Sequence, residues 1–161
     1  MKFTKLAALA ASAASLAANA FAQLPQSRVL TMDVAHTIAQ EAVAACKANG
    51  YNVTALVVDG LNQPKVLLRA DGATASTAEV AKMKATATML YNRNSGPAQP
   101  LPAGTAAPPA TIPGTINAQG AAPIKFGDVT IGAIAVSGAP GGDKDLACAV
   151  AAIAKVADKL K

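Results

Sequence analysis

The sequence contains one histidine, no tryptophan and two cysteines, and these scarcities exclude several kinds of site. Neither Gly-x-Ser-x-Gly nor His-Glu-x-x-His occurs, so the signatures of serine hydrolases and zinc proteases are absent. Two cysteines with one histidine make a poor zinc site. Without Cys-x-x-Cys-His, covalent attachment of a c-type haem is excluded. The composition therefore favours a binding protein over an enzyme.

Charged residues are also few, at 14%, and the basic ones are scattered rather than clustered. Nucleic-acid binding requires a clustered basic face, so we expect no nucleic-acid partner. The apolar stretch near the start of the chain is shorter than the roughly 20 residues that cross a bilayer, and no later segment is long and apolar enough, so we expect no membrane partner. Alanine supplies much of the 52% hydrophobic content and buries little area per residue. The core must therefore consist of helices packed closely on a sheet.

The first residues have the pattern of a secretory signal. Lys2 and Lys5 precede an apolar stretch that ends in the small-x-small sequence Ala20-Phe21-Ala22. We expect residues 1–22 to be cleaved and residues 23–161 to form one exported domain, periplasmic or secreted.

Patterns in the remaining chain predict three helices. The first covers residues 32–49, because Thr31 can cap it and Asn49-Gly50 stops it. The second covers about 77–91 and follows a capping box formed by Ser76 and Glu79. The third covers about 143–160. Its predicted apolar stripe consists of Leu146, Val150, Ile153, Ala157 and Leu160.

Two hairpins separate the helices. The first turns at Asp59-Gly60 between two apolar strands, and the second turns at Gly127-Asp128. Between them, residues 92–123 hold most of the prolines and show no periodicity, which predicts a long loop. Hairpins in place of β-α-β alternation predict a single α+β domain, with a mostly antiparallel sheet and helices packed on it.

Three stretches resemble the GlcG/HbpS family of haem-binding proteins: RADGA at 69–73, the alanine-flanked Lys84, and GAIAVSGAPGGDKD at 132–145. The resemblance extends from Leu30 to about Lys161. It implies a profilin-like fold with about five strands and assembly into a homo-oligomer. It also implies a small planar or anionic ligand, with haem favoured as the cofactor and redox sensing as a role. Met83 and Thr86 stand where the family commonly has larger polar side chains.

Lys84 lies on the inward stripe of the second predicted helix, with Val80, Ala87 and Tyr91. A buried ammonium needs a partner. Three interpretations stay open: an internal ion pair with Asp71 or Asp59, a side chain whose stem passes the core and carries the ammonium to solvent, or contact with the carboxylate of a ligand. Arg69, Asp71 and Lys84 are therefore candidate ligand-binding residues.

The segment from Ser137 to Gly142 delivers a strand into a helix start, where backbone amides can bind an anion. Ser137 and Gly138 join the candidate ligand-binding residues on this ground. The competing interpretation is that Asp143 caps the helix and uses the same amides itself.

His36 lies away from the apolar face of the first helix, so we expect a surface histidine that could ligate haem iron at a subunit interface. Tyr51, Tyr91, Met83 and Met89 are further candidates. Cys46 and Cys148 sit on the first and last helices, where an exported protein could keep a disulfide. An intersubunit bridge or two free thiols are equally open.

Two other functions are carried forward beside ligand binding. One is an accessory enzyme acting on a small hydroxy acid, with Lys84 and Asp71 as a proton-transfer pair. The other is an interaction module without a ligand, in which the proline-rich loop makes the contact.

Overall fold

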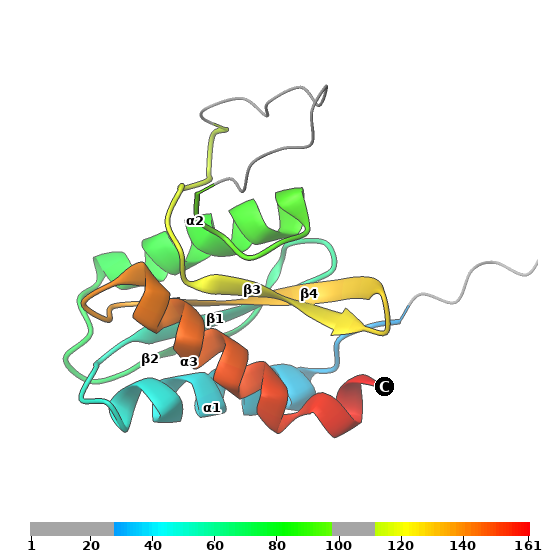
Figure 1. Cartoon of the computed structure of the whole chain (residues 1–161), viewed down its shortest axis with the longest axis horizontal. Coiled ribbons are helices and arrows are strands. Elements are labelled where there is room, and N and C mark those ends of the chain that lie inside the picture. Colours follow the sequence, from blue (N-terminus) through cyan, green and yellow to red (C-terminus); the bar gives the residue numbers. More distant parts are fainter. Residues whose placement is uncertain (1–27, 98–111) are drawn as a thin grey trace, which may run out of the picture.

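The computed structural model describes residues 28–97 and 112–161, which form one antiparallel sheet with helices on both faces (Figure 1). This confirms the predicted α+β class. The predicted signal segment and the middle of the proline-rich loop lie outside the described residues. Within the described part, no helix is both long and apolar enough to span a membrane.

The sheet is built from the two predicted hairpins, and its strand order is β2-β1-β4-β3. The first hairpin pairs β1 (Thr54–Asp59) with β2 (Pro64–Arg69), and the second pairs β3 (Ala121–Phe126) with β4 (Val129–Ser137). The two hairpins join through β1 and β4, where Val57 lies opposite Ile134. The described residues contain four strands where the resemblance implied about five, because neither 92–97 nor 112–120 pairs as a strand.

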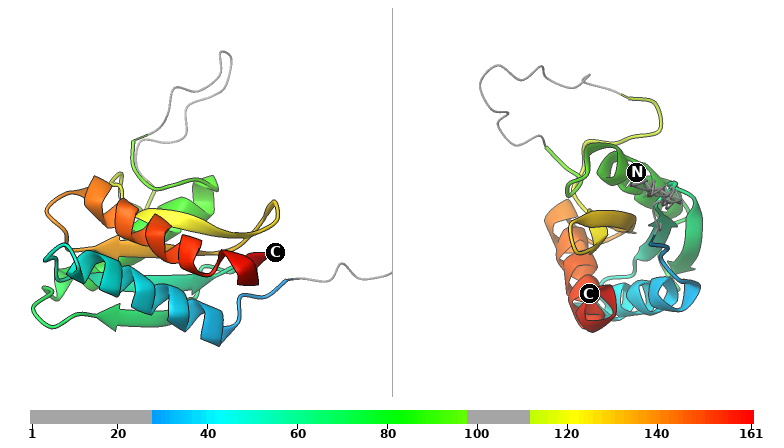
Figure 2. Two further views of the ribbon diagram at one scale, coloured as in Figure 1. Left: turned by 60° about the horizontal axis from the view of Figure 1, so that its bottom comes forward. Right: turned by 90° about the vertical axis from the view of Figure 1, so that its right-hand side faces the viewer.

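Helices α1 (Met32–Lys47) and α3 (Gly142–Lys155) lie side by side on one face of the sheet (Figure 2). The predicted cap of α1 is confirmed, since Thr31 Oγ1 accepts a hydrogen bond from the Val34 amide at 3.4 Å. Helix α1 ends at Lys47, two residues before the predicted end. The chain then reverses at Gly50, whose φ of 80° favours glycine.

The predicted apolar stripe of α3 is wrong. The buried face consists of Asp145, Cys148, Ala149 and Ala152, followed by Val156, whereas Val150 is 47% exposed. Small side chains face inward because α3 must approach both the sheet and α1, and the larger residues Leu146 and Ile153 are only half-buried beside them. The α-helix also stops before Val156, and a 3-10 turn (Ala157–Leu160) completes the chain.

Helix α2 (Ser76–Tyr91) covers the opposite face, against a smaller core that includes Leu56, Val58 and Ala133. The predicted capping box does not form. The helix starts one residue early, so Ala75 is the N-cap and Ser76 is already helical. Thr77 instead holds the start of the helix: its hydroxyl donates to the carbonyl of Thr74, and it lies 2.7 Å from the hydroxyl of Thr54 on β1.

A disulfide joins Cys46 of α1 to Cys148 of α3, which decides the pairing that the sequence left open. The two Cα atoms are 5.5 Å apart, and 102 positions separate the residues in the chain. Because the bond closes a long loop in the unfolded chain, its entropic contribution to stability is large.

We expect the double variant Cys46→Ala/Cys148→Ala to lose about 2–5 kcal/mol of unfolding free energy, because its unfolded chain is no longer crosslinked. Urea denaturation of the variant and the oxidised protein measures the difference. Wild-type protein reduced with dithiothreitol is the control and should resemble the variant. A variant as stable as the oxidised wild type would show that the disulfide constrains nothing.

Candidate functional site

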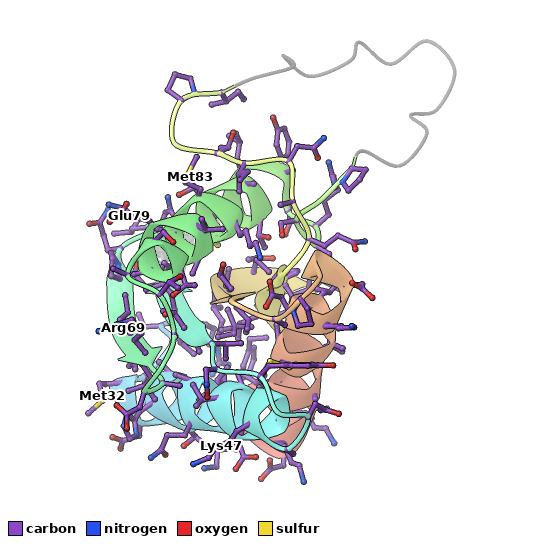
Figure 3. The ribbon with its side chains drawn as sticks, turned by 90° about the vertical axis from the view of Figure 1, so that its left-hand side faces the viewer. Met32, Lys47, Arg69, Glu79 and Met83 are labelled. Atoms are coloured by element: carbon purple, nitrogen blue, oxygen red, sulfur yellow. A yellow bond between two sulfur atoms is a disulfide. The ribbon has the colours of Figure 1, made fainter. Side chains whose placement is uncertain are left out.

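Several predicted site residues gather at one end of the sheet, where β2 and β4 end and where α2 and α3 begin. Thr54 lies opposite Arg69 on one side and opposite Ser137 on the other, so these three residues form a row across β2, β1 and β4. Gly138 follows Ser137 directly. Figure 3 views the molecule from this end, with Arg69 on the edge strand between α2 and α1.

Only part of this row is open to a ligand. Arg69 is exposed, and its guanidinium donates to the carbonyl of Ala73 at 2.6 Å. Ser137 is 6% exposed. Gly138 is exposed, with φ at 129°, and its backbone packs closely on Asn52. The structure therefore brings Arg69, Ser137 and Gly138 together, but only Arg69 presents a charge at the surface.

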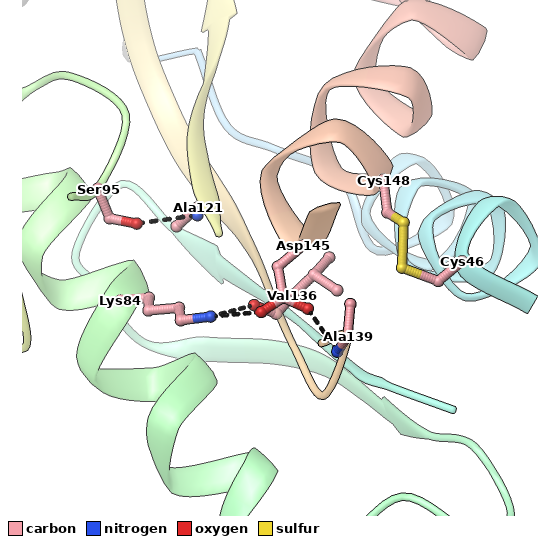
Figure 4. Close-up of polar contacts among 8 residues, drawn as sticks. All are labelled: Cys46, Lys84, Ser95, Ala121, Val136, Ala139, Asp145 and Cys148. Atoms are coloured by element: carbon pink, nitrogen blue, oxygen red, sulfur yellow. Dashed lines mark hydrogen bonds and ion pairs between the residues drawn. A yellow bond between two sulfur atoms is a disulfide. The ribbon is translucent and has the colours of Figure 1, made fainter. Parts of the chain in front are cut away.

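Lys84 is buried and points inward, as predicted, but its partner is neither Asp71 nor Asp59. Its Nζ atom lies 2.7 Å from Oδ2 of Asp145 and donates to the carbonyl of Val136 at 3.0 Å (Figure 4). Both side chains are 4% exposed. A buried ion pair of this kind is stable only when its remaining polar atoms also find partners.

The two aspartates that the sequence offered as partners lie elsewhere. Asp71 is exposed in the turn after β2. Asp59 holds the turn between β1 and β2, where its Oδ1 accepts from the amides of Leu61 and Gln63, both at 2.9 Å. The proposed proton-transfer pair of Lys84 and Asp71 is therefore not formed.

Asp145 also occupies the predicted anion cradle. Its Oδ1 atom accepts from the Ala139 amide at 2.9 Å, so the protein's own carboxylate binds the loop between β4 and α3 (Figure 4). The predicted cap by Asp143 is wrong, because α3 starts after Gly141 without a side-chain cap. Sequence reasoning missed Asp145, although its spacing of three and four to Cys148 and Ala149 places it on the buried face.

The end of the long loop closes over the ion pair at Gly120, which has a φ of 138°. Its carbonyl accepts from the Val136 amide at 2.8 Å. A Cβ atom at this position would lie 2.5 Å from Nζ of Lys84 and 2.6 Å from the Val136 carbonyl oxygen. Glycine is therefore required for the chain to pass this close to the ion pair.

Both ends of the loop are held together next to Gly120. The Ser95 amide donates to the carbonyl of Ala121 at 3.0 Å. The Ser95 hydroxyl accepts from the Ala121 amide, also at 3.0 Å (Figure 4). This pair of bonds joins the segment after α2 to the start of β3. It fixes the loop ends above the Lys84–Asp145 pair.

His36 is exposed on α1, as the sequence predicted. It belongs to the early turns of the helix, away from the Arg69 row. Met32, one turn earlier on the same face, is 57% exposed, and Val29 is 69% exposed. The guanidinium of Arg28 lies 4.5 Å from the centre of the Phe126 ring. His36 and Met32 thus lie exposed on the first turns of α1, whereas the Arg28 guanidinium stacks on Phe126 of β3.

The other candidate iron ligands are less accessible. Tyr51, Tyr91, Met83 and Met89 are all half-buried. Tyr91 has the guanidinium of Arg93 5.4 Å from its ring centre, and Tyr51 has the ammonium of Lys144 at 5.7 Å. Within the described residues, no cluster of three histidine, cysteine or acidic side chains could hold a bare metal ion.

The fold is that of a single α+β domain, and comparison with known proteins gives the family. A model of the family described as "Haem degrading protein HbpS-like" matches residues 30–154. The chain therefore belongs to the HbpS-like family, as its motifs indicated. None of the curated proteins compared with it matches.

Three solved structures are similar to this chain over nearly their whole length. The crystal structure of HbpS is 29% identical, with a TM-score of 0.71, and the match covers 83% of this chain and 94% of HbpS. A double mutant of HbpS from Streptomyces reticuli is 27% identical with the same TM-score of 0.71, over 95% and 99% of the two chains. A complex of PduOC with haem is 19% identical, with a TM-score of 0.64 over 79% and 94%, and shares the fold.

We expect Lys84→Met to lower the unfolding free energy by about 3–5 kcal/mol, because it leaves the Asp145 carboxylate buried without a cation. Lys84→Met/Asp145→Asn should recover part of this loss, since the amide oxygen can still accept from Ala139. Lys82→Met on the exposed side of α2 is the matched control and should stay within about 0.5 kcal/mol of wild type. Urea denaturation measures all four proteins. Equal stability of Lys84→Met and Lys82→Met would contradict the structural role of the pair.

Proposed function

We propose that this chain binds haem at its surface, with His36 as the iron ligand. The observation that carries the proposal is membership of the HbpS-like family over residues 30–154. His36 is the only histidine in the chain and is exposed, so its imidazole can reach a ligand without rearrangement of the core. When bound, haem supplies an iron centre with an open coordination position for an imidazole.

The surroundings of His36 support a surface site. Met32 lies one turn before His36 on α1, so its exposed thioether can pack on a flat apolar ring next to the imidazole. Arg28 adds a cation near the same end of the helix, as a partner for a propionate. A planar ligand placed here keeps one face open. A second copy of the chain can cover that face, so the proposal includes assembly into a homo-oligomer around the haem.

The Lys84–Asp145 pair supports the surface site indirectly. Lys84 already has a carboxylate and a carbonyl as partners, so binding a ligand there would require breaking the ion pair. Direct binding by Lys84 would also compete with the closely packed backbone at Gly120. The exposed cations of the surface therefore serve an anionic group better than the buried one does.

Export and redox sensing belong to the same proposal. The Cys46–Cys148 disulfide is typical of proteins in an oxidising compartment, and it agrees with a periplasmic or secreted protein cleaved after residue 22. Haem at the surface of such a protein is accessible to external oxidants. The accessory enzyme has less support, because its proposed proton-transfer pair of Lys84 and Asp71 is not formed. The interaction module stays an alternative, and residues 98–111 of its loop lie outside the described residues.

Titration of the oxidised protein with haemin tests the site. We expect a saturable Soret shift at micromolar haemin, with one haem per subunit or per dimer. His36→Ala should weaken binding at least tenfold and change the Soret position, because the iron loses its imidazole. Lys47→Ala, exposed in the last turn of α1 and far from His36 along the helix, is the control and should bind like wild type.

Two results would contradict the proposal. A response that rises without saturation, as with an unrelated basic protein, would exclude a haem site. Saturable binding with an unchanged spectrum in His36→Ala would reject His36 as the ligand.

A further inference from the structure

A pocket of about 320 Å³ lies between α1 and α3, on the outer side of the disulfide. Neither His36 nor the Lys84–Asp145 pair lines it. Its walls come from the end of α1, the segment before β1 and one side of α3; they are lined by Ala45, Asn49, Tyr51, Lys144, Ala147, Cys148 and Ala151.

The walls of this α1–α3 pocket are held in place by covalent and backbone bonds. The disulfide fixes the two helices with the cysteine Cα atoms 5.5 Å apart. After the reversal at Gly50, the Tyr51 amide donates to the carbonyl of Cys46 at 3.1 Å, which ties the aromatic wall to the same helix end. A pocket held this way needs little ordering when a ligand enters, so little binding energy is lost to ordering.

The lining combines apolar side chains with one aromatic ring and one cation. Three alanine methyl groups and the sulfur of Cys148 form apolar surface, and Tyr51 adds one aromatic side. The Lys144 ammonium lies 5.7 Å from the centre of the Tyr51 ring, so the cation and the aromatic ring are neighbours in the lining. Asn49 already donates its side-chain amide to the Ala45 carbonyl, which leaves its oxygen free to accept.

We propose that this α1–α3 pocket is a second binding site, which takes a small planar molecule carrying one carboxylate. The planar part would lie on the alanine methyl groups beside Tyr51, and the carboxylate would pair with Lys144. The volume is at the lower end of the roughly 300–1,000 Å³ range of small-molecule pockets, which suits one or two rings rather than a porphyrin. The site therefore differs from the proposed haem surface at His36 in its position and in the size of its ligand.

The probe that tests this site is 2-naphthoate, with 2-naphthamide as the uncharged compound of the same shape. We expect 2-naphthoate to produce saturable amide shifts in the NMR spectrum of the oxidised protein, concentrated at residues 45–51 and 144–151. The naphthamide should bind more weakly. Lys144→Ala should weaken naphthoate binding about fivefold, the factor that corresponds to the upper end of an exposed ion pair.

Two further variants separate loss of the site from loss of the fold. Ala147→Phe should abolish binding by filling the pocket, and its spectrum outside residues 45–51 and 144–151 should remain that of the folded protein. Lys155→Ala removes the same charge from the end of the same helix, outside the lining, and should bind like wild type. Absence of a saturable shift, or unchanged binding by Ala147→Phe, would overturn the site. Equal affinity for naphthoate and naphthamide would overturn its preference for a carboxylate.

Discussion

The ion pair between Lys84 and Asp145 is the interaction on which the arrangement of this protein depends. It joins α2 on one face of the sheet to α3 on the other, past the end of β4. Each charge also binds backbone: the ammonium bonds to Val136 and the carboxylate to Ala139. Because separated charges in such a place would be very costly, the pair specifies how the β4–α3 connection must run.

The rest of the fold is adapted to a chain with few large side chains. Aromatic residues make up 3% of the sequence, and alanines fill both faces of the sheet. Small residues let α1 and α3 approach each other and the sheet, but each buries little area. The disulfide compensates by restricting the unfolded chain, and it lies at the contact of the two helices where larger side chains are missing.

Local patterns in the sequence were sufficient for the hairpins, the start of α1 and the inward direction of Lys84. They failed where two segments distant in the chain decide the outcome. Asp145 is 61 residues from Lys84, and the larger apolar side chains of α3 drew the predicted stripe toward Val150. Helical periodicity does not include the packing of a neighbouring helix. It therefore could not show that the face of α3 with small side chains packs against α1 and the sheet.

The site was predictable to a similar degree. The pairing of Thr54 with Arg69 belongs to the predicted first hairpin, whereas the pairing of Thr54 with Ser137 joins the two hairpins and is implied by neither. The exposure of His36 follows from its helical register. The sequence alone does not identify the partner of Lys84, because Asp59, Asp71 and Asp145 offer the same carboxylate and their distances from Lys84 depend on the fold. Only the packing shows that Lys84 is occupied from within, which moves the expected ligand contacts from the core to the surface.

Lys84 is a structural cation and not a ligand contact. NMR spectroscopy of its side-chain ammonium group tests this role directly. The ammonium protons of Lys84 should exchange slowly with solvent, because they are hydrogen-bonded to Asp145 and Val136. The ¹⁵N resonance of the side chain reports both its chemical shift and this exchange rate. Saturating gallium protoporphyrin, a diamagnetic analogue of haemin, should leave its position and its exchange rate unchanged while the resonances of α1 near His36 shift. Loss of protection or a large shift of the Lys84 resonance on addition of the porphyrin would contradict the account.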